Sequence, residues 1–205
     1  MTPDPRAIRY SPIMSAAETV QKDGMDGVDL AQRFLESTTW IELPFNVYDN
    51  APICTLERLD GKRKRYDLMG SIFTDPHTPL YVEVKDYDSN GGKQGGEFWQ
   101  FLANAYSITA RDIKNHDDGR REFMWITRHP FNLKDWSKIT DPTRITEALE
   151  REPEALAGES IDPDILATVS ERIWLLVLHE RQERLMLTAK ELSLIEAQLN
   201  RKGKK

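Results

Sequence analysis

Three residues on two nearby segments of the sequence have side chains that together could hold a divalent cation. Asp67 lies on the first segment, 66–73, and Glu83 and Lys85 lie on a second segment in which apolar and polar residues alternate. Such alternation predicts half-buried strands, in which side chains two positions apart share a face. Glu83 and Lys85 therefore share a polar face, and Val82 and Val84 share the apolar face that we expect to pack on a helix.

The two segments are predicted to form an antiparallel hairpin, because Asp75-Pro76-His77 between them has strong turn chemistry. A turn centred there gives a register in which paired residue numbers sum to about 152. We therefore expect Asp67 opposite Lys85, with Glu83 diagonal to it. Cross-strand and diagonal neighbours lie roughly 5–8 Å apart on one face of a sheet, so two carboxylates and an ammonium group should converge.

A cluster of this kind suits Mg²⁺, with Mn²⁺ as an alternative. Mg²⁺ prefers oxygen ligands and usually takes only one or two carboxylates from the protein. Asp67 and Glu83 would supply these, and the backbone carbonyl of Val84 would add a third oxygen. Lys85 would lie beside the cation, where its charge would orient an attacking water and stabilise charge developing on a phosphate.

The sequences Tyr66-Asp67-Leu68 and Glu83-Val84-Lys85 resemble the signature of the PD-(D/E)XK nuclease superfamily, although no proline precedes the aspartate. The resemblance implies a restriction-endonuclease-like fold and metal-dependent hydrolysis of phosphodiester bonds in DNA, with RNA as the alternative. It implies Asp67 and Glu83 as metal ligands and Lys85 as the catalytic lysine. Nucleases of this kind serve in restriction, phage defence or repair.

Two further site residues come from the resemblance alone. Many members of the superfamily add an acid on the first helix, and Glu36 is the candidate for this metal ligand. Some members add a glutamine and a tyrosine four residues apart on the helix after the signature. Gln100 is carried over as the glutamine, but Asn104 stands four residues later, so no tyrosine is carried over.

The elements expected around these residues follow the order of the family core. Periodicity and turn residues predict a helix over 26–38 capped by Asp26, strands near 40–48, 64–73 and 80–86, a helix over 97–115 and a strand over 122–128. We therefore predict an α/β fold with a restriction-endonuclease-like core. In it a central mixed sheet is flanked by helices in the order αβββαβ, followed by a helical C-terminal extension.

The chain is expected to divide into an N-terminal arm (1–25), a nuclease-like core (26–130) and a C-terminal extension packed on the same domain (131–205). The arm could also be a short, loosely held helix. Within the extension, the apolar run 173–178 fits either a buried strand or part of a long helix. Residues 188–199 fit a capped helix.

Basic side chains near the signature are candidates for contacts with nucleic-acid phosphates. A basic run leads directly into the strand that bears Asp67: Lys62, Arg63, Lys64 and Arg65. Lys93 lies in a glycine-rich segment before a helix, where backbone amides can bind an anion. The alternatives are a solvated hairpin end for the basic run and a flexible connection for the glycine-rich segment.

The composition of the 205 residues, with 39% hydrophobic and 30% charged residues, is that of a globular protein. Cys54 is the single cysteine, which excludes an internal disulfide and a cysteine-built zinc site. No apolar run approaches the roughly 18 residues of a membrane span, and no signal peptide is visible, so we expect a cytoplasmic protein. The net charge of −6 is unusual for a nucleic-acid-binding protein. We therefore expect a second copy or another protein subunit to help deliver the substrate.

Two other classes of function fit the same sequence. The chain could be a catalytically inactive, nuclease-like binding subunit that docks through residues 173–199. It could also be an enzyme that acts on nucleotides. Loss of metal binding in Asp67→Ala would separate a catalytic site from a binding subunit, and turnover of small substrates without polymer cleavage would identify a nucleotide enzyme.

Overall fold

A mixed five-stranded sheet forms the centre of the protein. The computed structural model describes residues 16–38, 40–74, 76–85, 93–131 and 133–195. The strand order is β1-β4-β5-β6-β7, and the strands are β1 (Ile41–Asn46), β4 (Leu68–Ile72), β5 (Thr78–Lys85), β6 (Glu122–Thr127) and β7 (Ile173–Val177). The pairs β1–β4 and β4–β5 are antiparallel, whereas β5–β6 and β6–β7 are parallel.

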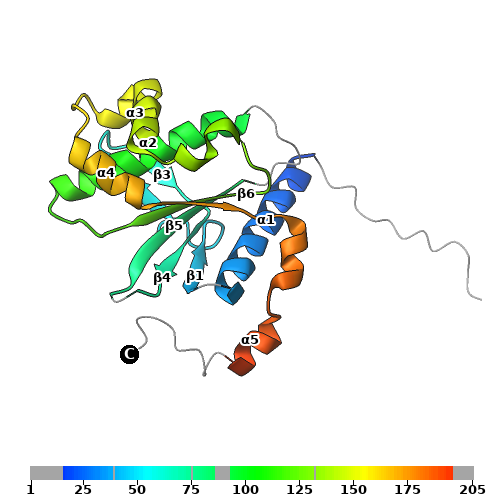
Figure 1. The fold of residues 1–205 in the computed structure, drawn as a ribbon. Helices are drawn as coiled ribbons and strands as arrows, with labels where there is room; N and C mark the ends of the chain where they lie inside the picture. Colours follow the sequence, from blue (N-terminus) through cyan, green and yellow to red (C-terminus); the bar gives the residue numbers. More distant parts are fainter. Residues whose placement is uncertain (1–15, 39, 75, 86–92, 132, 196–205) are drawn as a thin grey trace, which may run out of the picture.

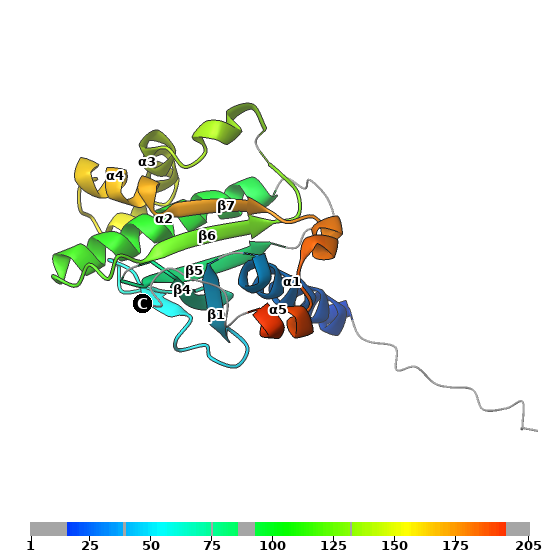
Figure 2. The same ribbon diagram turned by 60° about the horizontal axis from the view of Figure 1, so that its bottom comes forward.

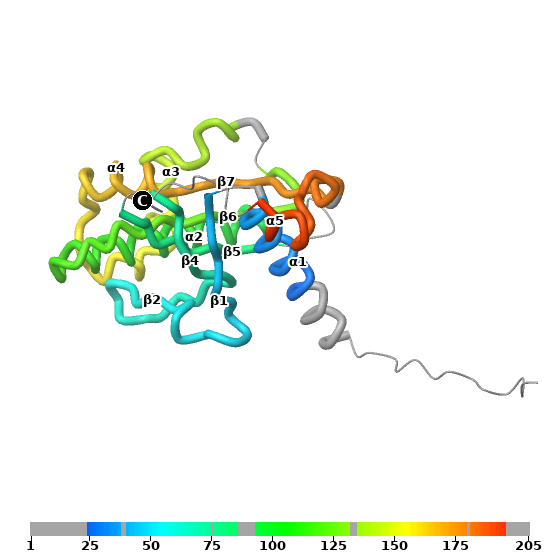
Figure 3. Tube along the Cα trace, turned by 90° about the horizontal axis from the view of Figure 1, so that it is seen from below, coloured from blue at the N-terminus to red at the C-terminus, as the bar shows by residue number. Residues whose placement is uncertain are grey.

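Helices cover both faces of this sheet, as Figures 1 and 2 show. One face packs on α1 (Ala16–Thr38), and the other packs on α2 (Lys93–Lys114), with α3 (Pro142–Arg151) and α4 (Pro163–Glu171) beyond it. The short helix α5 (Ala189–Ile195) lies near α1 (Figure 3). Short 3₁₀ helices occupy Leu133–Lys138, Pro153–Leu156 and Glu180–Leu185. The predicted α/β class, with a mixed sheet flanked by helices, is confirmed.

The alternation of β5 divides its side chains between two hydrophobic cores. Leu80 and Val82 are fully buried in the core under α1, and Val84 packs against that core. Tyr81 points to the opposite face and belongs to the core under α2. Because side chains in a strand alternate with a period of two, Glu83 lies on the α2 side, as its separation from Val82 and Val84 in the sequence predicted.

The first helix begins at Ala16, well before Asp26. Asp26 therefore lies inside α1 and does not cap it. Residues 16–25, expected to form an arm or a short helix, are the first turns of α1, and residues 1–15 lie outside the described part of the chain. Gly24 and Gly27 flank Asp26 and lower the local helix propensity. The sequence around Asp26, in the middle of α1, is therefore similar to the sequence at the N-terminal end of a helix.

The strand expected over 64–73 is two strands in two different sheets. β3 (Arg63–Arg65) pairs with β2 (Thr55–Glu57) in a separate hairpin, and β4 begins only at Leu68. The partner strand changes between two residues, since Tyr66 N donates to Cys54 O and Asp67 N donates to Val82 O, both at 2.9 Å. Tyr66 therefore turns into the α2 core, where its ring lies 5.5 Å from that of Tyr81, and does not share a face with Leu68.

The β2–β3 hairpin is docked on α2 by buried polar side chains. Arg58 donates to Asn104 Oδ1 at 2.8 Å. The hydroxyl of Ser107 accepts from Leu59 N at 3.0 Å and donates to Ala155 O at 2.6 Å. These bonds hold β3 beside the central sheet, at the end where Asp67 begins β4.

The apolar run 173–178 contributes β7, which pairs in parallel with β6 and forms one edge of the central sheet. Of the two alternatives for this run, the buried strand is the one observed, so the extension expected to be helical also contains a strand. The run lies between α4 and a short 3₁₀ helix, and five residues are enough for a strand but short for a helix.

Gly70 is required where β4 passes the irregular edge strand β1, whose pairing shifts register between Glu42 and Phe45. A Cβ at Gly70 would lie 1.9 Å from Glu42 O and 2.7 Å from Leu43 Cα. We expect Gly70→Ala to lower the free energy of unfolding by about 1–3 kcal/mol or more, because the backbone of β1 must move. Urea denaturation measures this loss.

The control for Gly70→Ala is Gly95→Ala, in the first turn of α2. A Cβ at Gly95 would meet no atom within 4 Å, and alanine is favoured over glycine in a helix by up to about 1 kcal/mol. Gly95→Ala should leave the stability unchanged or raise it. A Gly70→Ala protein as stable as wild type would contradict the close approach of β1 and β4.

Candidate active site

Asp67, the residue before β4, lies opposite Glu83 of β5. The observed pairing joins Leu68 to Val82 and Met69 to Tyr81, and extending it by one residue sets Asp67 across from Glu83. The predicted position of Asp67 opposite Lys85 is therefore wrong. The hairpin turn is centred one residue earlier than its turn-forming residues suggested, since Ile72 already pairs with Thr78.

The side chain of Asp67 continues the pairing of β5 where the backbone of β4 ends. Its Oδ2 accepts a hydrogen bond from Val84 N at 2.7 Å. In an extended strand the N–H and C=O of one residue point to the same side, so the Val84 carbonyl also faces the side of Asp67. This places the carbonyl oxygen that the sequence nominated near the first carboxylate.

The carboxyl group of Asp67 is held in an environment that disfavours its charge. Burial and the negative charge of Glu83 raise its pKa to about 6, while the hydrogen bond from Val84 N and the charges of Lys85 and Lys64 act in the opposite direction. Two carboxylates that repel each other in a partly desolvated position form a site that a divalent cation would stabilise.

Lys85 lies between two carboxylates. Its Nζ is 2.9 Å from Glu83 Oε1 and 3.1 Å from Glu97 Oε2 on α2, and it lies 5.6 Å from the ring centroid of Trp125. Burial lowers the pKa of Lys85, but the carboxylates of Glu83 and Glu97 outweigh burial and raise it above its usual value. Lys85 is therefore a cation at neutral pH.

Lys64 is a second lysine at this site, in a position that the sequence did not reveal. Its Nζ lies 2.7 Å from Glu83 Oε2, so each oxygen of Glu83 has its own lysine. Within the basic run, the alternation of β3 points Lys64 inward and leaves Arg63 and Arg65 exposed. Lys62 pairs with Asp60 at 3.6 Å and with Glu154 at 3.9 Å.

Gln94, and not Gln100, is the buried glutamine of α2. Gln94 is 1% exposed; its amide nitrogen donates to the Thr127 hydroxyl and to His129 O, and its Oε1 has no partner among the described residues. Thr127 is the register partner of Lys85, so Gln94 lies at the same end of the sheet as Lys85. The sequence did not point to Gln94, because the pattern predicts a helix that starts only at residue 97, whereas α2 starts at Lys93.

Gln100 is exposed and lines a separate surface pocket of about 570 Å³ beside the cluster. Lys93, the other basic candidate, lies in the same pocket, which shares Glu97 with the Lys85 ion pair. The pocket is lined by Lys93, Gly96, Glu97, Trp99, Gln100, Arg151 and Glu152. Both side chains thus lie next to the cluster and outside the Asp67–Glu83 pair, and their roles stay predictions.

Glu36 holds α1 against the edge strand. Its Oε1 accepts from Leu43 N at 2.9 Å and from Gln32 Nε2 at 3.4 Å. These bonds explain a glutamate at this position through the packing of α1 on β1. Its role as a metal ligand stays a prediction from the resemblance.

The donor set fits Mg²⁺. The described residues contain no group of three or more His, Cys, Asp or Glu side chains arranged to hold a metal. They do contain the opposed pair Asp67 and Glu83 with the Val84 carbonyl on the same side, and Mg²⁺ commonly takes one or two carboxylates and completes its shell with water and substrate.

No family model and no curated protein matches the chain. Solved structures of the Acinetobacter baumannii Cap4 SAVED/CARF-domain containing receptor do match. Those with the cyclic trinucleotides 2'3'3'-cAAA and 3'3'3'-cAAA each align over 88% of this chain and 36% of the receptor, at 11% identity and a TM-score of 0.38. A third structure of the receptor aligns over 85% of this chain, at 10% identity and a TM-score of 0.37. This chain spans about a third of those receptors, and a likeness at these scores carries no argument about function.

Within the described residues, no helix has the length and apolar character needed to cross a membrane.

Asp67→Asn should stabilise the metal-free protein at neutral pH. Because the folded-state pKa of Asp67 is raised from 3.8 to about 6, ionisation costs stability as the pH rises through that range. The shift corresponds to about 3 kcal/mol at pH 7.5 and less than about 1 kcal/mol at pH 4. Asparagine keeps an oxygen that can accept from Val84 N. Urea denaturation in EDTA at the two pH values measures the difference.

The matched control for Asp67→Asn is Asp29→Asn, which removes an exposed carboxylate on α1. It should show no comparable pH-dependent gain. A difference between Asp67→Asn and wild type that is the same at pH 4 and pH 7.5 would contradict the buried-charge interpretation.

Lys64→Met should tighten the binding of Mn²⁺. The substitution releases Glu83 Oε2 from its ion pair, so a cation no longer has to displace an ammonium group. The affinity should rise about fivefold, which corresponds to about 1 kcal/mol. Isothermal titration calorimetry at pH 8 measures the change, with Lys62→Met as the control of equal charge. Unchanged or weaker binding in Lys64→Met would show that Lys64 does not compete with the metal.

Proposed function

We propose that this chain is a metal-dependent nuclease with a restriction-endonuclease-like core. The observation that carries the proposal is the opposition of Asp67 and Glu83 on adjacent strands, with Lys85 two residues beyond Glu83 on the same face. The pairing of β4 with β5, the hydrogen bond from Val84 N to Asp67 Oδ2 and the ion pair of Lys85 with Glu83 bring these three groups together. The order of α1, the antiparallel strands β1, β4 and β5, helix α2 and the parallel strand β6 also agrees with the αβββαβ core expected from the signature.

The chemistry assigned to the chain follows from these groups. Asp67, Glu83 and the Val84 carbonyl would hold Mg²⁺ or Mn²⁺, and the bound cation would neutralise phosphate charge and lower the pKa of water. Lys85 is a cation at neutral pH because Glu83 and Glu97 raise its pKa. It therefore acts by orienting water and stabilising negative charge at the phosphate, and not by accepting a proton.

The proposed substrate is a nucleic acid, DNA in the first place and RNA as the alternative. Arg63 and Arg65 precede the cluster residues in the sequence, and Lys93 follows them. These exposed side chains line two surface pockets and offer positive charge to a nucleic acid. Because the whole chain carries a net charge of −6, we propose that a second copy or another subunit assists delivery of the substrate in a defence, restriction or repair system.

One observation favours a second candidate, a nuclease-like binding subunit that does not cleave. Both oxygens of Glu83 are occupied, by Lys64 at 2.7 Å and by Lys85 at 2.9 Å. If the ion pair with Lys64 is stronger than the interaction with a divalent cation, the site stays closed to metal. Metal binding by the purified protein separates the two candidates.

Cleavage of plasmid DNA, single-stranded DNA and RNA in Mg²⁺ or Mn²⁺ tests the proposed activity. Lys85→Ala should reduce the rate at least about 100-fold, because it removes the charge that stabilises the developing negative charge. Glu83→Gln and EDTA should abolish cleavage. The control is Lys62→Ala, which removes an exposed lysine two residues before Lys64. This variant should cleave as wild type does.

Each result of this assay has a definite meaning. Cleavage that is lost in Lys85→Ala, Glu83→Gln and EDTA supports the proposed nuclease and identifies its substrate. Cleavage that persists in Lys85→Ala would exclude the proposed centre. Metal binding without cleavage would support a nuclease that needs its partner, and absence of both would support the binding subunit.

A further inference from the structure

The outer face of the β2–β3 hairpin carries two arginines. The register pairs Thr55 with Arg65 and Glu57 with Arg63, so these four side chains share one face, while the side chains of Leu56 and Lys64 point to the other. Leu56 packs against the core under α2. The apolar packing of the hairpin is therefore made on the inward face, and on the outward face Glu57 forms an ion pair with Arg111 of α2.

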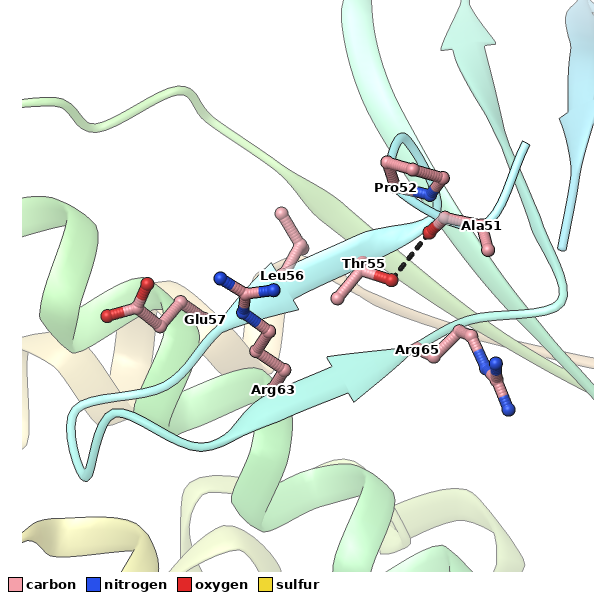
Figure 4. A pocket seen from close by; sticks show the side chains of 7 residues that line it. All are labelled: Ala51, Pro52, Thr55, Leu56, Glu57, Arg63 and Arg65. Carbon is pink, nitrogen blue, oxygen red and sulfur yellow. Dashed lines mark hydrogen bonds between the residues drawn. The ribbon is translucent and has the colours of Figure 1, made fainter.

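A hollow of about 730 Å³ lies along this face, lined by Ala51, Pro52, Thr55, Leu56, Glu57, Arg63 and Arg65. In Figure 4, Arg63 reaches across the hairpin toward β2, and Arg65 extends from the other end of β3. Two residues on one face of a strand are separated by about 7 Å. In Figure 4 the two side chains extend in opposite directions from β3, so their guanidinium groups lie farther apart than the strand positions.

The two arginines differ from their basic neighbours in having no acidic partner among the described residues. Lys62 pairs with Asp60 and Glu154, and Lys64 pairs with Glu83. The whole chain has a net charge of −6. Arg63 and Arg65 have no acidic partner among the described residues, so both guanidinium groups are available to bind anions in the hollow. Guanidinium groups bind phosphate oxygens through paired hydrogen bonds.

Glu57 is the one acidic side chain that lines the hollow, and its charge is already compensated. Glu57 Oε1 lies 3.0 Å from an Arg111 guanidinium nitrogen on α2. The ion pair fastens the carboxylate to the helix, so Arg63, its register partner, is not neutralised by it.

We propose that the hollow on the β2–β3 hairpin is a secondary site that binds the sugar–phosphate backbone of a nucleic acid through Arg63 and Arg65. The inference rests on the proposed function. Of the four residues of the basic run, it assigns the contact with the substrate backbone to Arg63 and Arg65. Lys62 and Lys64 are instead engaged in ion pairs within the protein. Because Lys64, between the two arginines, contacts Glu83 on the inner face, β3 connects the backbone site directly to the cluster.

The test measures the affinity of fluorescein-labelled oligonucleotides by anisotropy across a series of KCl concentrations, in EDTA so that no cleavage occurs. Duplex DNA, single-stranded DNA and single-stranded RNA form three arms. Arg63→Ala/Arg65→Ala should weaken binding and reduce the slope of log affinity against log salt by about 1.8 for a duplex or about 1.4 for a single strand. The arm with the largest loss identifies the form of nucleic acid.

The matched control is Arg181→Ala/Arg184→Ala, which removes two exposed arginines from the 3₁₀ helix Glu180–Leu185. It changes the net charge equally and should leave the slope unchanged. An equal loss in both double variants would reduce the effect to net charge and overturn the proposal. An unchanged slope in Arg63→Ala/Arg65→Ala, or no binding by wild type in any arm, would overturn it as well.

A small substrate separates this inference from the proposed function. Hydrolysis of bis(p-nitrophenyl) phosphate in Mn²⁺ needs the Asp67–Glu83 centre. The compound itself is too small to reach the hairpin. Arg63→Ala/Arg65→Ala should hydrolyse it at the wild-type rate. If wild type fails to hydrolyse both the small substrate and nucleic acids while the salt slope still falls in the double variant, the backbone site stands and the nuclease does not. If hydrolysis persists and the slope is unaffected, the nuclease stands and the backbone site does not.

Discussion

The hydrogen bond from Val84 N to the Asp67 carboxylate determines the geometry of the whole site. The backbone of β4 stops pairing with β5 after Asp67 N has bonded Val82 O, and the next N–H of β5 on that side belongs to Val84. A backbone N–H inside the protein must find an acceptor, and Asp67 Oδ2 provides it at 2.7 Å. The requirement fixes the carboxylate against β5, directly opposite Glu83.

A row of alternating charges follows from that position. A carboxylate held next to Glu83 in a partly desolvated place raises the free energy of both ions, and lysines from two strands compensate for it. Lys64 and Lys85 each take one oxygen of Glu83, and Glu97 takes the other side of Lys85. The row joins β3, β5 and α2, so the site is also part of what holds these elements together. A cation entering the Asp67–Glu83 pair would have to reorganise the row.

The surrounding architecture places this row at one end of β5. The central strands are buried on both faces by two separate cores, under α1 and α2. The charged residues of β5, Glu83 and Lys85, therefore lie at its carboxyl end, where α2 begins and the pairing with β4 has ended. The β2–β3 hairpin reaches the same end because Asn104 and Ser107 fasten it to α2. Ligand sites at the carboxyl ends of strands in α/β sheets are common for this reason.

The sequence by itself determined the local features of this protein. Alternation in 80–85 determined which side chains of β5 face each core, because a strand has a period of two, and helical spacing determined the body of α2. The sequence did not determine the register of β4 and β5, because its turn residues are compatible with more than one turn length. The observed register sets Asp67 opposite Glu83, whereas the sequence predicted Lys85 there. Tertiary structure decided that Lys64 faces Glu83, that Gln94 is buried where Gln100 is exposed, and that 173–177 is a strand. Each of these depends on partners far away in the chain, on docking of the hairpin against α2 and on pairing with β6, and no local pattern encodes such contacts.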